Sequence, residues 1–110
     1  MADVDQFDLE YEHRDGRVVV RLSGELDAAT APRLHSRLTD NAHTDVRQVV
    51  IDLEAVEFID STGLRALLQS REHVVAAGRA FAVTNPTDAA VRLFQLTGTQ
   101  ELLMDDGNGA

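Results

Sequence analysis

A hydroxyl group stands where a strand pattern gives way to a helix pattern, in the segment Asp60-Ser61-Thr62-Gly63-Leu64. A serine in the first turn of a helix lies near unpaired backbone N–H groups and the positive end of the helix dipole, which stabilise a phosphate. Phosphorylation of Ser61 would add about −1.5 to −2 charges beside Asp60 and Glu57. The segment therefore predicts a serine whose modification changes what the surrounding surface binds.

The same segment has a purely structural interpretation. Asp60 or Ser61 accepts a hydrogen bond from an unpaired N–H group of the first helical turn, and Gly63 lets the backbone turn tightly. Capping and regulation are compatible with each other, so both interpretations stay open at this point.

Signatures of catalysis are missing. The sequence has no lysine, so it has no Gly-x-x-x-x-Gly-Lys phosphate loop, and no Gly-x-Gly-x-x-Gly follows the first strand pattern. The histidines have no partner at i+4 and are typical of solvated surface residues: His13, His35, His43 and His73. The acidic residues around one strand end match no calcium loop: Asp52, Glu54, Glu57 and Asp60. We expect no enzyme, no metal site and no cofactor.

The composition narrows the class of protein. The 110 residues suit one domain, with a core at about 7–104 and a flexible tail at 105–110. Ten arginines against 19 acidic residues give a net charge of −9, which argues against nucleic acid and anionic membranes as partners. The absence of cysteine excludes disulfides and thiolate catalysis. Neither a signal peptide nor a membrane span is apparent, so we expect a cytoplasmic protein.

Strand and helix patterns alternate along the chain. Residues 7–13 and 17–22 predict two strands joined by an Asp15-Gly16 hairpin turn, followed by a loop at 23–29. Thr30 and Pro32 predict the start of the first helix. The apolar run 49–53 predicts a buried strand, which a loop at 54–57 follows.

The second half of the chain begins with the clearest helix pattern. Arg71 is the one polar interruption of its apolar stripe, and Gly78 is expected to end the helix. The stripe consists of Leu64, Leu67, Leu68, Val74 and Val75. Residues 81–83 predict a strand. Asn85 as cap and Pro86 in the first turn predict a third helix, which Gly98 stops, and residues 101–104 predict a short last strand. The order implies an α/β domain with a mostly parallel sheet of four to five strands, opened by one antiparallel hairpin.

The sequence resembles the STAS domain, and within it the bacterial anti-sigma factor antagonists. The resemblance extends over about Val18 to Met104 and rests on motifs in matching order and spacing: Gly24-Glu25-Leu26-Asp27, Thr30-Ala31-Pro32, Val49-Val50-Ile51-Asp52-Leu53, Phe58-Ile59-Asp60-Ser61-Thr62-Gly63-Leu64 and Leu93-Phe94 with Leu96-Thr97-Gly98. It implies three helices packed mainly on one side of the sheet.

The resemblance also implies a mechanism. Family members of this kind bind an anti-sigma factor that is also a serine kinase of the histidine-kinase-like ATPase fold, and binding frees the sigma factor. The kinase phosphorylates a serine that follows an aspartate at the start of the second helix, which weakens the complex, and a serine phosphatase reverses the step. The matching residues are Asp60 and Ser61. We expect a monomer or weak dimer.

The resemblance further suggests which residues contact the partner. Asp27 matches the family loop that takes part in kinase contact. Thr62 matches a family position that is occupied by either serine or threonine. Arg65 departs from the family pattern, in which a small residue is usual. The partner surface expected on this basis comprises Asp27, Asp60, Ser61, Thr62, Gly63 and Arg65.

Other STAS domains perform other tasks, and one remains as an alternative. Small soluble STAS subunits accompany lipid-transport ABC systems, and the chain length fits them. Such subunits often lack the serine that this sequence carries at position 61.

Overall fold

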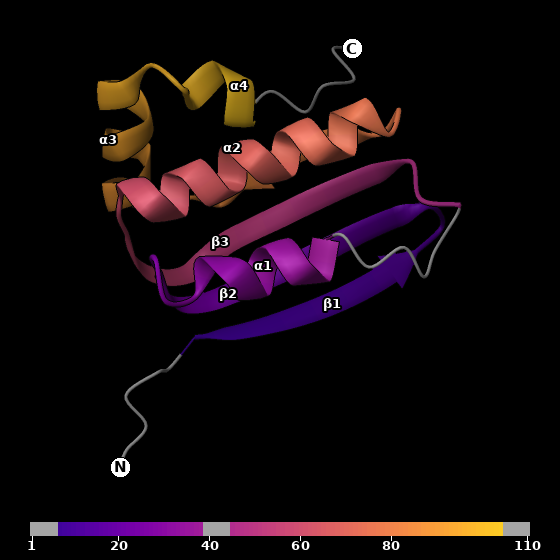
Figure 1. The fold of residues 1–110 in the computed structure, drawn as a ribbon, viewed down its shortest axis with the longest axis horizontal. Coiled ribbons are helices and arrows are strands. Elements are labelled where there is room, and N and C mark those ends of the chain that lie inside the picture. Colours follow the sequence, from indigo (N-terminus) through magenta and orange to yellow (C-terminus); the bar gives the residue numbers. More distant parts are fainter. Residues whose placement is uncertain (1–6, 39–44, 105–110) are drawn as a thin grey trace.

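The computed structural model describes residues 7–38 and 45–104, which form a four-stranded sheet with helices along one face (Figure 1). The strands run in spatial order β1-β2-β3-β4, the first pair antiparallel and the other pairs parallel. The elements in chain order are β1 (Asp8–Arg14), β2 (Arg17–Leu26), α1 (Ala31–Leu38), β3 (Gln48–Ile59), α2 (Ser61–Ala76), β4 (Ala80–Thr84), α3 (Asp88–Thr97) and α4 (Gln100–Met104).

The predicted hairpin is confirmed. Asp15 and Gly16 both have positive φ, 54° and 80°, as the two central residues of a turn that follows the right-handed twist of its strands require. The return strand β2 continues to Leu26, so the prediction of a loop beginning at residue 23 was wrong. Gly24, at φ 91°, lies between two register shifts in the pairing with β3. These irregularities let the polar, glycine-containing segment continue as a strand.

Strand β3 is longer than predicted. It has 12 residues, and the expected loop at 54–57 is strand as well. Val56 and Ile59 are buried while their neighbours Glu57 and Phe58 are exposed. This far end pairs with the equally extended end of β2, so neither strand would reach this length alone.

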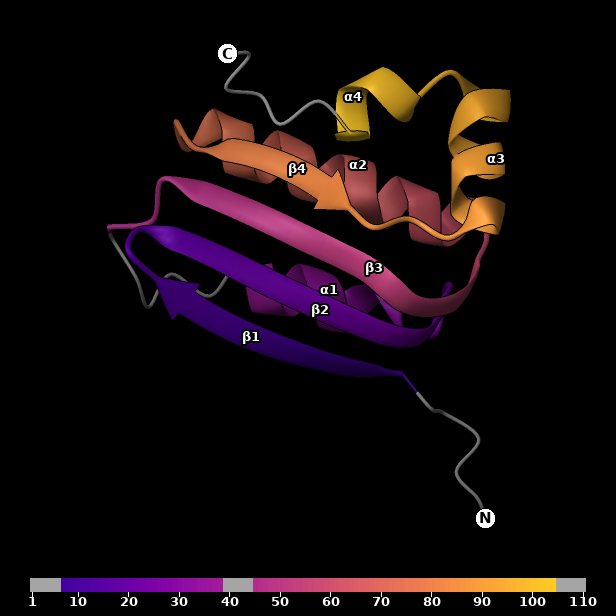
Figure 2. The ribbon, with the colours of Figure 1, turned by 180° about the vertical axis from the view of Figure 1, so that it is seen from behind.

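Helices α1 and α2 cover one face of the sheet, and α3 and α4 lie on the β4 side (Figure 1). Seen from behind, the opposite face carries no helix within the described ranges (Figure 2). The core lies between sheet and helices, and its fully buried side chains include Val20, Ile51, Leu53, Leu34, Leu67, Phe81 and Phe94. Val50 and Ala82 are also buried but stand outside this core cluster, as expected for the opposite face.

The helix predictions need three corrections. In α2 the buried polar residue is Ser70, whose hydroxyl donates to the Ala66 carbonyl at 2.7 Å, whereas Val75 is 45% exposed. Helix α3 begins at Asp88 with Thr87 as its cap, because Asn85 adopts a left-handed φ of 54° and cannot join a helical turn. The predicted strand at 101–104 belongs to α4, so the described residues contain four helices and four strands.

The predicted helix ends at glycine are confirmed. Gly78 and Gly98 have φ of 81° and 71°, which lets the chain leave α2 and α3 in the left-handed conformation. Within residues 7–38 and 45–104, every helix is too short or too polar to cross a lipid bilayer.

Candidate functional site

The loop containing Asp27 and the start of α2 meet at one edge of the sheet, the one formed by the C-terminal ends of β2 and β3. They follow β2 and β3, which are parallel and therefore end on the same side. Leu26 and Ile59 are register partners at these ends, and the Asp60 backbone N–H donates to the Leu26 carbonyl at 3.4 Å. The two segments that the sequence separates by more than thirty positions thus share one hydrogen-bonded corner.

Asp60 is the residue that caps α2. Its backbone is extended, with φ −111° and ψ −172°, and its Oδ1 accepts a hydrogen bond from the Gly63 N–H at 2.9 Å. This geometry satisfies one of the free N–H groups of the first turn. Of the two residues that could have capped the helix, Asp60 does so and the Ser61 side chain is not needed for it.

Ser61 is the first residue of α2, and it is exposed. Its hydroxyl makes no hydrogen bond with the described part of the chain, so its substitution should cost little stability. The hydroxyl is displayed at the positive end of a 16-residue helix, where an added phosphate is electrostatically favourable. The position therefore combines access for a modifying enzyme with tolerance of the modification.

Gly63 is buried, and its role is to let α2 approach the end of β2. A Cβ atom at this position would overlap the Leu26 carbonyl oxygen, and would lie 2.9 Å from the Leu26 carbonyl carbon and 3.1 Å from Ile59 Cγ1. The nearest atoms belong to backbone and cannot rotate away. A tight turn, the interpretation drawn from the sequence, is not the main reason for glycine here. Gly63 thereby allows the first turn of α2, which begins with Ser61, to lie against the end of β2.

Asp27 organises its own loop. Its Oδ1 accepts hydrogen bonds from the backbone N–H groups of Ala29 at 3.0 Å and Thr30 at 3.3 Å. Thr30 is 5% exposed; its Oγ1 accepts from the Asp27 N–H at 3.0 Å and donates to the Glu25 carbonyl at 2.7 Å. These contacts give Asp27 a structural task, while its other carboxylate oxygen makes no hydrogen bond with the described residues.

Thr62 and Arg65 complete the exposed start of α2. Arg65 lies four positions after Ser61, so the two residues occupy the same helix face one turn apart. The Arg65 guanidinium forms no ion pair with the described residues, and it is free to meet an anionic group. The edge also carries the exposed acids Glu25 and Glu57.

The sequence interpretation missed one residue of this edge, Phe58. Its side chain is 48% exposed, and it pairs in register with Glu25 at the end of β3. An exposed aromatic ring adds apolar contact area to this charged end of the sheet. Simple alternation along the strand would not have revealed it, because Val56, two positions before Phe58, is buried and the register against β2 shifts between them.

The side chains at this end of the sheet supply several kinds of binding group. In the ranges 7–38 and 45–104 no three or more histidine or acidic side chains gather as a metal site would need. The edge presents a hydroxyl, a cation, an aromatic ring and several carboxylates on a rigid frame.

Comparison with known proteins agrees with this arrangement. Residues 8–106 match the STAS domain family. The anti-sigma-B factor antagonist of Staphylococcus aureus (strain NCTC 8325 / PS 47) is 31% identical over 84 residues, which is 76% of this chain and 78% of that protein. An anti-sigma factor antagonist from Mycobacterium paratuberculosis has a crystal structure that matches with TM-score 0.78 at 33% identity, over 94% of this chain and 87% of that chain.

A second similar structure is the Bacillus cell fate determinant SpoIIAA in its phosphorylated form. It matches with TM-score 0.68 at 25% identity, over 89% of this chain and 88% of that chain. The family match spans nearly all described residues and includes both segments that form the corner around Leu26. This chain belongs to the STAS domain family.

Proposed function

We propose that this protein is an anti-sigma factor antagonist whose binding is switched off by phosphorylation of Ser61. The observation that carries the proposal is the exposed Ser61 hydroxyl at the start of α2, freed from capping by Asp60. Support comes from relatives named as anti-sigma factor antagonists and from a similar protein known in a phosphorylated form.

The partner is an anti-sigma factor that is itself a serine kinase of the histidine-kinase-like ATPase fold, and a serine phosphatase restores the binding form. The partner surface consists of the start of α2 with Ser61, Thr62 and Arg65, the Asp27 loop, and Phe58. Asp60 and Gly63 belong to it as positioning residues, because they hold the first turn of α2 against β2. The exchange takes place in the cytoplasm, where ATP is available to the kinase.

Phosphorylation should act on the complex and leave the fold intact. A phosphate on an exposed residue at a helix N-terminus stabilises the free domain by about 0.3–1 kcal/mol. The cost falls on the interface, where the added charge must be desolvated beside Asp60 and the exposed Glu57. A penalty of about 2.7 kcal/mol corresponds to a loss of affinity of about 100-fold.

The modification site can be tested directly. Each candidate anti-sigma kinase of the source organism is incubated with the protein and ATP, and the modified peptide is mapped by mass spectrometry. We expect phosphate on Ser61, loss of modification in Ser61→Ala, and phosphate still on Ser61 in Thr62→Ala, the matched control next to it. Phosphate on Thr62 with Ser61 unmodified would overturn the proposal.

A further inference from the structure

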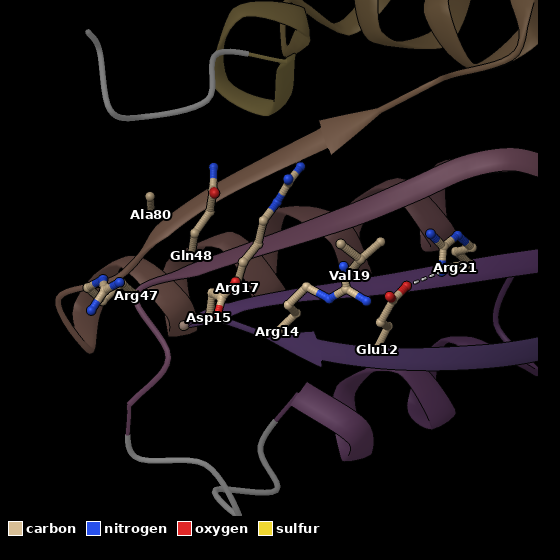
Figure 3. A pocket seen from close by; sticks show the side chains of 10 residues that line it. Glu12, Arg14, Asp15, Arg17, Val19, Arg21, Arg47, Gln48 and Ala80 are labelled. Carbon is tan, nitrogen blue, oxygen red and sulfur yellow. Dashed lines mark hydrogen bonds and ion pairs between the residues drawn. The ribbon is translucent and has the colours of Figure 1, made fainter.

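A second surface lies at the opposite end of the sheet from Ser61, on the face without helices (Figure 2). Four of the ten arginines of the chain line a shallow cavity of about 640 Å³ there. We name this surface the arginine pocket, and its principal residues are Arg14, Arg17, Arg21, Arg47 and Gln48 (Figure 3).

The arginine pocket is built on one row of the sheet. Arg14 pairs with Arg17 across the hairpin, Arg17 with Gln48, and Gln48 with Ala80, so the row crosses all four strands. Arg14 and Arg17 are thus like charges directly opposite each other, an arrangement that destabilises a sheet. Figure 3 shows Arg17 rising from this face beside Gln48, and Arg14 extending toward Glu12.

Only one arginine of this pocket forms an ion pair with the residues that the structure describes. Arg21 is satisfied by Glu12, with Nη1 to Oε1 at 2.9 Å, and by Asp52, with Nε to Oδ2 at 3.8 Å. By contrast, the other three arginine side chains form no hydrogen bond or ion pair with the described residues: Arg14, Arg17 and Arg47.

The charge balance of the lining is opposite to that of the chain. The lining holds four arginines and two acidic side chains, Glu12 and Asp15, and Arg21 also pairs with Asp52, which leaves an excess of one positive charge in a protein of net charge −9. With 19 acidic residues in the chain, neutralising partners are plentiful elsewhere. Cations concentrated at one place on such a protein indicate a site for an anion.

The frame of the arginine pocket is held by backbone hydrogen bonds. The Gly16 carbonyl of the hairpin turn accepts from the N–H groups of Arg47 at 2.7 Å and Gln48 at 3.2 Å, and the Arg47 carbonyl accepts from Ala80 N–H at 2.9 Å. The Arg47 guanidinium lies over Gly16, where a Cβ atom would be 3.1 Å from Nη2. Three segments distant in sequence therefore present their side chains from a preorganised base.

We propose that the arginine pocket binds a small anion bearing two or more phosphate groups. Guanidinium groups bind phosphate oxygens in a bidentate fashion. The charge of a diphosphate matches three arginines that have no ion pair among the described residues better than the charge of a single carboxylate does. The volume suits a small molecule. Nucleic acid and anionic membranes would be repelled by the remaining surface, which carries the large negative excess. The site is remote from Ser61, and the proposal does not depend on the function proposed above.

The test uses inorganic pyrophosphate as the probe, titrated into the full chain by calorimetry in low-salt buffer without metal ions. We expect saturable binding that weakens when salt is raised, because the contacts are ionic. Arg17→Gln and Arg47→Gln should each lower the affinity about tenfold or more, as expected for loss of a charge-assisted hydrogen bond. The matched control is Arg92→Gln, which removes the same charge from an exposed position of α3 outside the pocket and should leave the affinity within about twofold.

A second readout is thermal stability. Pyrophosphate at a hundredfold excess over its Kd should raise the unfolding midpoint by roughly 10 °C, and by much less in the Arg17→Gln protein. Three results would each overturn the proposal: no saturable binding of pyrophosphate, an equal loss of affinity in Arg92→Gln and Arg17→Gln, or tighter binding of a glutamate-rich peptide than of pyrophosphate.

Discussion

Replacement of Gly63 by alanine tests the contact that places Ser61 beside the Asp27 loop. The added methyl group would overlap the carbonyl oxygen of Leu26 and crowd Ile59 Cγ1 at 3.1 Å. Because Gly63 has an ordinary helical backbone, alanine would otherwise be favoured there by up to about 1 kcal/mol. Helix propensity and steric overlap therefore predict opposite signs for the change in the free energy of unfolding, and the measured sign decides between them.

The steric effect should prevail. Extra methylene-sized groups in packed sites typically cost about 1–3 kcal/mol, and the cost is greatest where the neighbour is backbone. Relief of the overlap requires α2 to move away from β2, which also weakens the hydrogen bond from Asp60 N–H to the Leu26 carbonyl, worth about 0.5–1.5 kcal/mol. After subtraction of the propensity gain, we expect Gly63→Ala to lower the free energy of unfolding by about 2 kcal/mol and the midpoint by roughly 10 °C.

Urea unfolding followed by circular dichroism measures this free energy, with Gly78→Ala as the control. Gly78 has open space around its Cβ position but a φ of 81°, so its replacement isolates the cost of the left-handed conformation, about 1–2 kcal/mol. If the Gly63→Ala protein is as stable as the parent or more stable, the close approach of α2 to β2 does not constrain this position and our reasoning about it is wrong.

Three further outcomes follow from individual contacts. Asp27→Ala should lower the free energy of unfolding by about 1–2 kcal/mol, because two backbone N–H groups lose their acceptor, whereas Asp27→Asn should lose less; urea unfolding distinguishes them. Asp60→Ala should cost about 1 kcal/mol in the same assay through loss of the α2 cap. The hydrogen bond from Arg21 holds the pKa of Glu12 below its usual 4.5, so an NMR titration should show a lowered midpoint that rises in Arg21→Gln. Because this folded-state pKa is lowered, any stabilisation from Glu12 exists above its unfolded pKa and disappears as pH falls through the folded pKa.

Asp27→Ala cannot test partner contact by itself. The hydrogen bonds of Asp27 to the loop before α1 mean that alanine perturbs stability and binding together. Asp27→Asn is therefore the sharper test of contact, because it removes the charge and retains an acceptor oxygen.

Local chemistry made several elements predictable from the sequence. Asp15-Gly16 specifies a tight hairpin by itself, and Gly78 and Gly98 end helices because they adopt positive φ at little cost. The order of the elements and the parallel pairing of most strands followed from the alternation of strand and helix patterns. The ends of β2 and β3 were not predictable, because Ser23 and Gly24 favour a turn locally and become strand only through pairing.

Some features of the candidate site could likewise be predicted from the sequence, and others could not. Ser61 could be found from the sequence because helix start and hydroxyl are local features. The close contact of Gly63 with Leu26 and the exposure of Phe58 depend on the register of two distant strands, which one sequence does not reveal. The hydrogen bonds of Asp27 likewise depend on how its loop closes over Thr30.

The central claim is that phosphate on Ser61 weakens binding to the anti-sigma kinase. The most direct measurement is titration calorimetry of the unmodified and the Ser61-phosphorylated protein against the cognate kinase with ADP, the nucleotide that remains after transfer. We expect a loss of affinity of about 100-fold on phosphorylation, with a smaller loss for Ser61→Asp and none for Ser61→Ala. Equal affinity of the two forms would contradict it.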